Sequence, residues 1–186
     1  MAEYSIVTAM GEDGSIGYYD KTTNKYVLPW KCKDDMTFFK NLTTTNLTGE
    51  IPKVKNVVIM GKNTYLSLPG KYLHNRINIV ISSTYDDWRH VANKNIIVFQ
   101  DFQTCLNYCK SMNYSNVYVI GGSELYKEAL NNNCLKSVIV SVIPKSYYKP
   151  QLIPNIFFPL TLSELENFSN KSLLYKTRFV NVYSFK

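Results

Sequence analysis

Short apolar runs alternate with helical patterns along most of this chain. Apolar runs bounded by turn signals predict buried strands, and here they cover residues 4–10, 54–60, 77–81, 95–99 and 116–120. Helical patterns lie between them and cover residues 34–46, 61–68, 101–112 and 123–131, and Asp101 is the expected cap of the third. Residues 11–17 are rich in turn formers, and the polar stretch 18–26 predicts an exposed, mobile loop.

The pattern changes after residue 131. Residues 135–143 and 173–185 are typical of long strands, and the proline-containing segment between them shows no strong helix. Strand–helix alternation followed by strand pairs predicts an α/β fold with a mostly parallel sheet and an antiparallel C-terminal edge. The chain has no internal repeat and no linker-like tract, so we expect a single domain over residues 1–186.

A carboxylate stands on the apolar face of the first expected helix. Pro29 extends the residue before it, so this helix begins only after Trp30, with Asp34 or a residue just before it as the cap. Asp35 then shares a helical stripe with Phe39, Leu42 and Asn46. A buried Asp is costly unless its pKa rises or a ligand pairs with it, so Asp35 is a candidate functional residue. The alternative is that Asp35 lies in solvent or caps the helix, a role for which Asp34 is better placed.

Composition and charge narrow the class of protein. A hydrophobic content of 45% and a charged content of 19% are typical of a soluble globular protein. With no membrane-length apolar run and no signal peptide, the chain is expected to be a cytoplasmic enzyme or binding protein without a membrane partner, although it could be one domain of a longer protein. The net charge of +7 is compatible with nucleic acid or with an anionic small ligand, and the scattered lysines favour the second.

The cysteines and arginines limit the candidate chemistry further. Cys32, Cys105, Cys109 and Cys134 do not have a zinc-binding spacing, so no metal site is predicted. We expect these cysteines to be buried thiols in a reducing compartment. Of the 21 basic residues only Arg76, Arg89 and Arg178 are arginines, and these are the candidates for fork-shaped binding of a carboxylate.

Two expected strands run directly into glycine-led helix starts, at Gly61 and at Gly121-Gly122. Helix N-termini bind phosphates, and two such turns at the carboxyl ends of parallel strands fit a dinucleotide lying across the sheet. Either turn alone is more simply an ordinary strand-to-helix connection, because neither has the usual dinucleotide fingerprint. The hydroxyls of residues 82–84, together with Lys62, could hold a further phosphate. Arg76, just before its strand, could grip a carboxylate, although a surface charge is common there.

Six short motifs resemble the dihydrofolate reductases in their order and spacing. They are Leu28-Pro29-Trp30 with Asp35 and Phe39, residues 58–64 (VIMGKNT), Ser67-Leu68-Pro69, residues 75–78 (NRIN), residues 120–126 (IGGSELY), and Phe157-Phe158-Pro159. The resemblance covers the chain from Ile6 to about Tyr183. It implies a central eight-stranded, mainly parallel twisted sheet flanked by about four helices. It also implies NADPH-dependent reduction of 7,8-dihydrofolate to tetrahydrofolate.

The same resemblance assigns roles to residues on the substrate side. Asp35 matches the only ionisable group of the pterin pocket, where it polarises the ring and favours protonation at N5. Trp30 matches a position that orders a water, and Leu28 belongs to the loop that admits the proton-donating water. Arg76 matches the residue that grips the α-carboxylate of the glutamyl tail. The pocket-lining positions are matched by Val7, Ala9, Met36, Phe39, Leu68, Leu73, Ile120 and Ser141.

On the cofactor side the resemblance implies a larger set of NADPH-binding positions. They are matched by Ala9, Ile16, Gly61, Lys62, Asn63, Thr64, Ser82, Ser83, Thr84, Ile120, Gly121, Gly122, Ser123, Glu124, Leu125 and Tyr126.

The chain departs from the family pattern in three places. The segment from Gly17 to Leu28 is longer than in many relatives. Ser141 stands where the family usually has a threonine that hydrogen-bonds the active-site acid. Ser83 and Gln100 stand where some relatives have arginines beside the cofactor 2′-phosphate, which leaves Lys62 as the main positive charge there.

Two other functions compete with this hypothesis. A related reductase could act on another heterocycle, such as a pyrimidine of riboflavin synthesis, but a glutamyl tail explains Asp35 and Arg76 together. A non-catalytic nucleic-acid-binding role rests on the net charge and the aromatic content, and the scattered lysines argue against it. We therefore expect dihydrofolate and NADPH as ligands and a monomer. The sequence leaves open whether a thymidylate synthase is fused to or associated with the chain.

Overall fold

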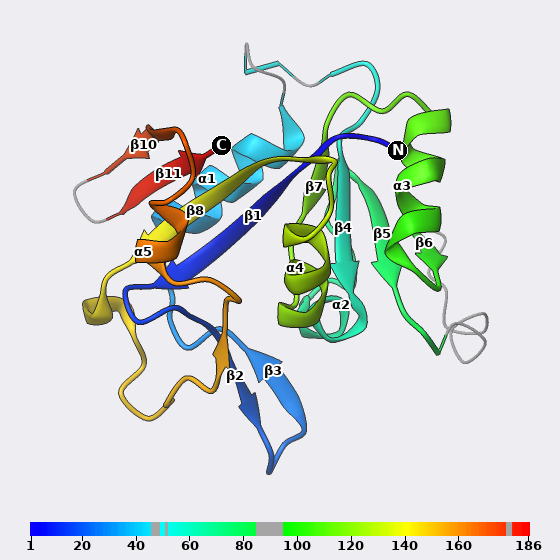
Figure 1. The fold of residues 1–186 in the computed structure, drawn as a ribbon. Helices are drawn as coiled ribbons and strands as arrows, with labels where there is room; N and C mark the ends of the chain where they lie inside the picture. The colour runs from blue at the N-terminus through cyan, green and yellow to red at the C-terminus, as the bar shows by residue number, and fades with distance from the viewer. Residues whose placement is uncertain (46–48, 51, 85–94, 178–179) are drawn as a thin grey trace.

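The computed structural model describes residues 1–45, 49–50, 52–84, 95–177 and 180–186. Its centre is an eight-stranded sheet in the order β10-β11-β8-β1-β7-β4-β5-β6 (Figure 1). The pairs from β8 through β1 to β6 are parallel, while β11 runs antiparallel to β8 and β10. The predicted α/β fold, with a mostly parallel sheet and an antiparallel C-terminal edge, is therefore confirmed. The strands of this sheet are β1 (Tyr4–Gly11), β4 (Val57–Gly61), β5 (Ile77–Ile81), β6 (Ile96–Phe99), β7 (Val117–Val119), β8 (Leu135–Ile143), β10 (Lys171–Lys176) and β11 (Asn181–Phe185).

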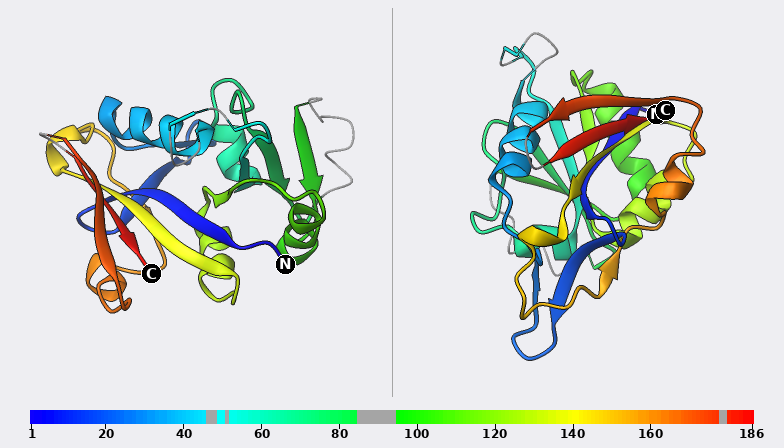
Figure 2. Two further views of the ribbon diagram at one scale, coloured as in Figure 1. Left: turned by 90° about the horizontal axis from the view of Figure 1, so that it is seen from above. Right: turned by 90° about the vertical axis from the view of Figure 1, so that its left-hand side faces the viewer.

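Helices cover both faces of the sheet. α1 (Lys33–Thr44) and α2 (Lys62–Ser67) lie on one face, and α3 (Phe102–Ser111) and α4 (Ser123–Leu130) lie on the other (Figure 2). Beyond β8 the chain adds a 3-10 turn, η2 (Lys145–Tyr147), and a one-turn helix, α5 (Leu162–Leu165). The described chain thus has five α-helices where about four were expected. None of its described helices is both long and apolar enough to span a bilayer.

The central strands are buried on both faces, as expected for strands of a parallel sheet. Alternate residues of β4 therefore enter two different cores. Val57 and Ile59 pack with residues of α3 and α4, whereas Val58 and Met60 pack on the side of α1 and α2. Because Asp35 lies on α1, it lies on the same side of the sheet as the second of these cores.

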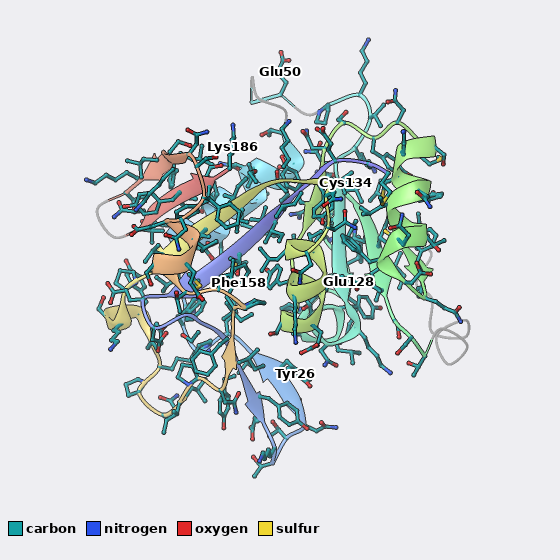
Figure 3. All side chains as sticks on the ribbon, viewed as in Figure 1. Tyr26, Glu50, Glu128, Cys134, Phe158 and Lys186 are labelled. Carbon is teal, nitrogen blue, oxygen red and sulfur yellow. The ribbon has the colours of Figure 1, made fainter. Side chains whose placement is uncertain are left out.

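The stretch 18–26 is not the loop that its polarity suggested. β2 (Ser15–Asp20) and β3 (Lys25–Val27) form an antiparallel hairpin that joins β9 (Ile156–Phe157) in a small sheet (Figure 1). The rings of Tyr19 and Tyr26 pair across the hairpin with their centroids 4.7 Å apart. Figure 3 shows Tyr26 on this hairpin, away from the main sheet. Cross-strand aromatic pairs of this kind stabilise hairpins, and the polar side chains simply face solvent.

Other boundaries also differ from the sequence expectation. β4 begins at Val57 rather than Val54, and the single strand expected over 173–185 is divided between β10 and β11. At the start of α1 the cap position is Cys32, without a side-chain cap bond, and Asp34 lies in the first turn. Asp101 does cap α3, because its carboxylate accepts a bond from the Thr104 N–H at 2.7 Å. Asn46, Arg89 and Arg178 lie outside the described residues.

Candidate active site

Asp35 lies on the inward face of α1 and is only 6% exposed. Burial raises the pKa of its carboxyl group, and interaction with the Ser141 hydroxyl of β8 opposes that rise. The position of Ser141 follows from the register of the sheet, in which it pairs with Ala9 of β1. Apart from Asp35, no acidic or basic side chain in the described part of the chain is classed as buried. A carboxyl group that is buried from solvent and has a raised pKa has the environment expected of a functional group.

Trp30 lies beside the start of α1 and is 3% exposed. Its indole Nε1–H is buried without a hydrogen-bond partner among the described residues. Buried donors normally find a partner, so this N–H is a candidate donor to a bound molecule or water. The indole ring packs against Tyr148 with the centroids 5.3 Å apart, and the two residues also form a backbone bridge.

The middle of β1 is held by a buried tyrosine of α4. The Tyr126 hydroxyl donates to the Val7 carbonyl at 2.9 Å. Burial raises the pKa of Tyr126, and the nearby charge of Asp35 adds to that rise, so the hydroxyl remains a donor at neutral pH. A carbonyl oxygen has two lone pairs, so this bond leaves Val7 able to accept a second one.

Arg76 is tied to the same helix as Asp35. Its Nη1 donates to the Thr43 hydroxyl at 2.8 Å, its Nε donates to the His74 carbonyl at 3.0 Å, and its guanidinium lies 5.8 Å from the centre of the Phe39 ring. Burial lowers the pKa of Arg76 to about 10, which still leaves it charged at neutral pH. Among the described residues no carboxylate pairs with it. Arg76 also lines a cavity of about 400 Å³ together with Tyr72, Leu73 and His74.

The two glycine turns predicted to bind a dinucleotide meet in space. The Gly61 N–H donates to the Gly121 carbonyl at 2.6 Å. Gly121 has a φ of +123°, and a Cβ there would lie 3.2 Å from the Thr64 hydroxyl oxygen. Only glycine adopts that conformation readily, and its small size lets the two turns pack closely. The peptide between Gly121 and Gly122 is cis.

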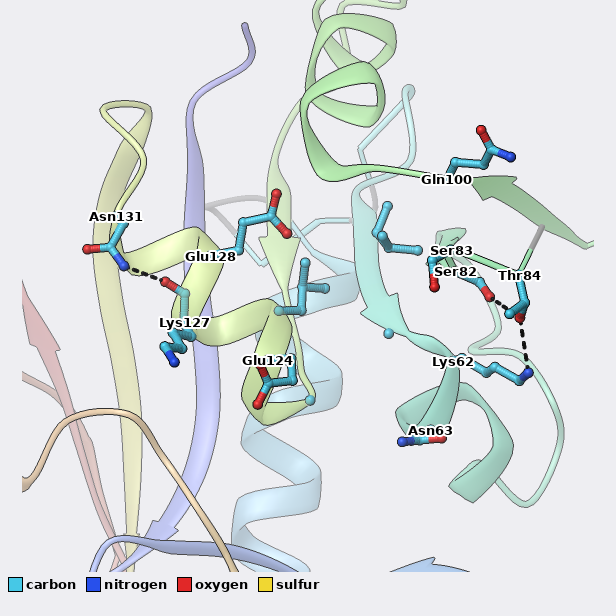
Figure 4. Close-up of a pocket in the computed structure, with 14 residues that line it drawn as sticks. Lys62, Asn63, Ser82, Ser83, Thr84, Gln100, Glu124, Lys127, Glu128 and Asn131 are labelled. Atoms are coloured by element: carbon cyan, nitrogen blue, oxygen red, sulfur yellow. Dashed lines mark hydrogen bonds between the residues drawn. The ribbon is translucent and has the colours of Figure 1, made fainter.

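A cavity of about 740 Å³ opens beside these turns, at the carboxyl ends of β4 and β5 (Figure 4). One wall carries Lys62 and Thr84, where the lysine Nζ donates to the threonine hydroxyl at 3.2 Å. The Ser82 hydroxyl lies a further 3.2 Å from that of Thr84. The cavity also contains predicted cofactor positions, namely Gly61, Asn63, Ser83, Gly122, Glu124 and Leu125.

The opposite wall was only partly found from the sequence. Glu124 was a candidate, but Lys127, Glu128 and Asn131 were not, and all four line the cavity from α4 or from its C-cap, Asn131 (Figure 4). Their numbering follows the i, i+3, i+4, i+7 spacing of one helix face. Extending that spacing from Glu124 would have found the other three. Gln100 lines the same cavity.

Comparison with known proteins identifies the family. The dihydrofolate reductase family model matches residues 3–171. The chain belongs to the dihydrofolate reductase family. Similar relatives include the dihydrofolate reductase of Candida albicans, which is 31% identical over 140 residues, and that of Heliothis virescens, which is 34% identical over 133 residues. The matched parts span 74% and 69% of this chain and 66% and 70% of those relatives.

A second group of similar proteins is much longer than this chain. The bifunctional dihydrofolate reductase-thymidylate synthase of Acanthamoeba polyphaga mimivirus is 30% identical over 179 residues. That match spans 94% of this chain but only 30% of the relative. The chain therefore corresponds to a part of these bifunctional proteins.

Within this dihydrofolate reductase fold, some of the predicted site residues do not lie in an enclosed pocket. Leu28 is 43% exposed and Met36 is 56% exposed, whereas Phe39, Leu68, Leu73 and Ile120 are half-buried around the core beside α1. Ile16 packs against the core on the other face of the sheet. Ser123 donates to the Phe157 carbonyl at 3.0 Å, which fastens the start of α4 to β9.

Proposed function

We propose that this chain catalyses the NADPH-dependent reduction of 7,8-dihydrofolate to 5,6,7,8-tetrahydrofolate, with hydride transfer to C6 and protonation at N5. This reaction supplies one-carbon metabolism and nucleotide synthesis. The observation that carries the proposal is that a buried carboxyl group, Asp35, lies on α1 and a charged guanidinium, Arg76, is bonded to Thr43 near the end of the same helix. Family membership is consistent with this activity.

The separation of these two groups suits an elongated substrate. Arg76 contacts Thr43 on α1. Thr43 lies about 12 Å along the helix axis from Asp35, at a rise of about 1.5 Å per residue. We infer that the pterin ring lies at Asp35 and that the α-carboxylate of the glutamyl tail lies at Arg76. Between them Phe39, Leu68 and Leu73 supply apolar surface of the kind that surrounds bound aromatic ligands.

Asp35 polarises the pterin in this mechanism. Its carboxylate would accept hydrogen bonds from the pterin amino group and the N3 side of the ring, a geometry that raises the basicity of N5. The carbonyls of Val7 and Ile120 would accept further bonds from the amino groups. The proton itself would come from a water admitted by the segment that bears Leu28, and the Trp30 N–H would order a water near the pterin. Asp35 is therefore a polariser rather than a direct proton donor.

The residues around the larger cavity fit a dinucleotide cofactor. Two close-packed glycine turns leave room for a pyrophosphate, and Lys62 with the hydroxyls of Ser82 and Thr84 offers donors to a 2′-phosphate. NADPH would supply the hydride when bound. The chain itself would hold the cofactor through Gly61, Asn63, Thr64, Gly121, Gly122 and Ser123, and would exclude water from the space between cofactor and pterin.

The proposed protein partner rests on the names of the relatives. A thymidylate synthase, fused or associated, is proposed because several similar proteins carry one by name. We also propose a cytoplasmic monomer, with neither nucleic acid nor membrane as a partner.

The test is a direct assay of the purified chain. Loss of reduced-nicotinamide absorbance should require dihydrofolate, and mass spectrometry should identify tetrahydrofolate as the product. A parallel reaction with an aminopyrimidine substrate of riboflavin synthesis tests the competing reductase activity. Turnover of the pyrimidine but not of dihydrofolate would show that the proposed substrate is wrong.

A further inference from the structure

Tyr148 occupies a position that the proposed reaction does not explain. It follows η2 in the segment between β8 and β9, and its hydroxyl reaches the turn that joins β1 to β2. The Tyr148 Oη lies 2.7 Å from the Ser15 Oγ and donates to the Asp13 carboxylate at 3.3 Å. The Ser15 hydroxyl and N–H both donate to the same carboxylate oxygen, at 2.6 and 3.0 Å.

Gly11 is the residue that makes room for this hydroxyl. A Cβ built at Gly11 would lie 1.6 Å from the Tyr148 Oη, a distance at which two atoms cannot coexist. Asp13 Oδ1 and Ser15 Oγ would each lie 2.7 Å from the same Cβ. The φ of Gly11 is not in the left-handed region, so its need for glycine comes from the tyrosine rather than from the backbone.

The other side of Tyr148 is attached to Trp30. Besides the ring contact and the backbone bridge between these two residues, the Lys149 N–H donates to the Pro29 carbonyl at 2.8 Å. The Lys31 N–H donates to the Tyr147 carbonyl at 3.4 Å. Backbone hydrogen bonds thus join the segment around Tyr148 to the residues that precede α1.

The negative charge of Asp13 strengthens the hydrogen bond that it accepts from Tyr148. Burial works to raise the pKa of Asp13, but hydrogen bonds from Ser15 and Tyr148 outweigh it and hold that pKa below its ordinary value. Burial also raises the pKa of Tyr148. At neutral pH a protonated phenol therefore faces an ionised carboxylate, and hydrogen bonds of that type are stronger than neutral ones.

We propose that Tyr148 is a positioning residue for the reaction proposed above, fastening the turn of residues 11–15 to Trp30. Ala9 of β1 lies two residues before this turn, and Trp30 precedes the helix that bears Asp35. One side chain therefore fixes the relative placement of the cofactor side and the substrate side of the site. Displacements of about 1 Å between reacting groups can lower rates by up to about 100-fold, so loss of this link should be felt in turnover.

The first test removes only the hydroxyl. In Tyr148→Phe the ring contact with Trp30 is kept, and kcat is expected to fall by roughly tenfold while the KM values for dihydrofolate and NADPH change by less than about threefold. Tyr19→Phe is the matched control, because it removes a hydroxyl on the neighbouring hairpin whose one side-chain partner among the described residues is the exposed Asn24, at 2.6 Å. A Tyr148→Phe enzyme with the kcat of the wild type would overturn the inference.

The second test does not depend on activity. Gly11→Ala should lower the urea midpoint of unfolding strongly in the wild type and less in the Tyr148→Phe background, where the nearest of the three clashing atoms is gone. Equal losses in the two backgrounds would contradict the inferred contact. If the wild type fails to reduce dihydrofolate, the proposed function is wrong, and this double-mutant cycle still decides whether Tyr148 fastens the turn.

Discussion

Arg76 donates to the Thr43 hydroxyl at 2.8 Å, and this bond ties the guanidinium to the helix that carries Asp35. The end of this helix is also held in place, because the buried Asn56 side chain donates to the carbonyls of Thr43 and Thr45 at 3.2 and 3.0 Å. The Asn116 side chain in turn donates to Asn56 at 3.0 Å. The distance between the two proposed substrate-binding groups is therefore set by one helix and by the bonded side chains of the buried Asn56 and the half-buried Asn116.

Arg76→Leu should weaken dihydrofolate binding by about 2 kcal/mol, or roughly 30-fold in Kd, because charge-assisted hydrogen bonds to a carboxylate are lost. Isothermal titration measures the affinity directly. Lys55→Leu is the control, since Lys55 lines the same cavity but is exposed. Equal losses in the two variants would mean that the carboxylate is attracted by general charge rather than gripped by Arg76.

Asp35→Asn should lower turnover of dihydrofolate by roughly 100-fold near neutral pH while NADPH affinity stays near the wild-type value. The neighbouring Asp34→Asn variant serves as the control, because Asp34 lies in the first turn of α1 and is only half-buried. Steady-state kinetics and a fluorescence titration with NADPH separate the two effects. Full activity in Asp35→Asn would remove Asp35 from the mechanism.

The same substitution should make the fold more stable at neutral pH. Burial raises the pKa of Asp35 in the folded chain, so between the unfolded and folded pKa values the folded state holds more protons. The stability contributed by the protonated form is complete below the unfolded pKa and is lost as the pH rises through the folded pKa. Asp35→Asn should therefore unfold at a higher urea concentration than the wild type at pH 7, and this advantage should shrink toward pH 4.

Ser141→Ala should move the pH dependence of kcat/KM to higher pH. The Ser141 hydroxyl favours the ionised form of Asp35, so its removal leaves desolvation unopposed and the pKa rises further. Ser141→Thr restores the hydroxyl and should return the profile toward that of the wild type. Ser137 lies on the same strand as Ser141, and its hydroxyl is bonded to that of Ser5 on β1 at 2.8 Å. Ser137→Ala should therefore leave the pH profile unchanged.

Lys62→Gln should weaken NADPH binding by roughly tenfold, which is about 1.4 kcal/mol, and should leave NADH binding nearly unchanged. The reason is the position of Lys62 beside the hydroxyls of Ser82 and Thr84, where the additional phosphate of NADPH is proposed to lie. Lys127→Gln, on the α4 wall of the same cavity, is the matched control. If the two lysine variants lose the same affinity for both cofactors, Lys62 does not select the 2′-phosphate.

The sequence alone determined the parts of this protein that depend on local pattern. Apolar runs predicted the parallel strands, because a strand buried on both faces is mostly apolar. Helical spacing placed Asp35 on the inward face of α1, and the Asp101 cap and the two glycine turns followed from the local chemistry of helix starts. Family membership could likewise be inferred from the sequence, because the order and spacing of six short motifs can be read directly along the chain.

Tertiary structure decided what depends on residues far apart in the chain. The hairpin of β2 and β3 is stabilised by the contact of Tyr19 with Tyr26 and by the pairing of β9 with β2. The local sequence of this polar stretch does not predict either partner. The α4 wall of the larger cavity exists only because α4 lies across from Lys62. The need for glycine at position 11 arises from the hydroxyl of Tyr148, which long-range packing brings there. Local periodicity carries no information on such contacts, because they depend on where the rest of the chain places the second partner.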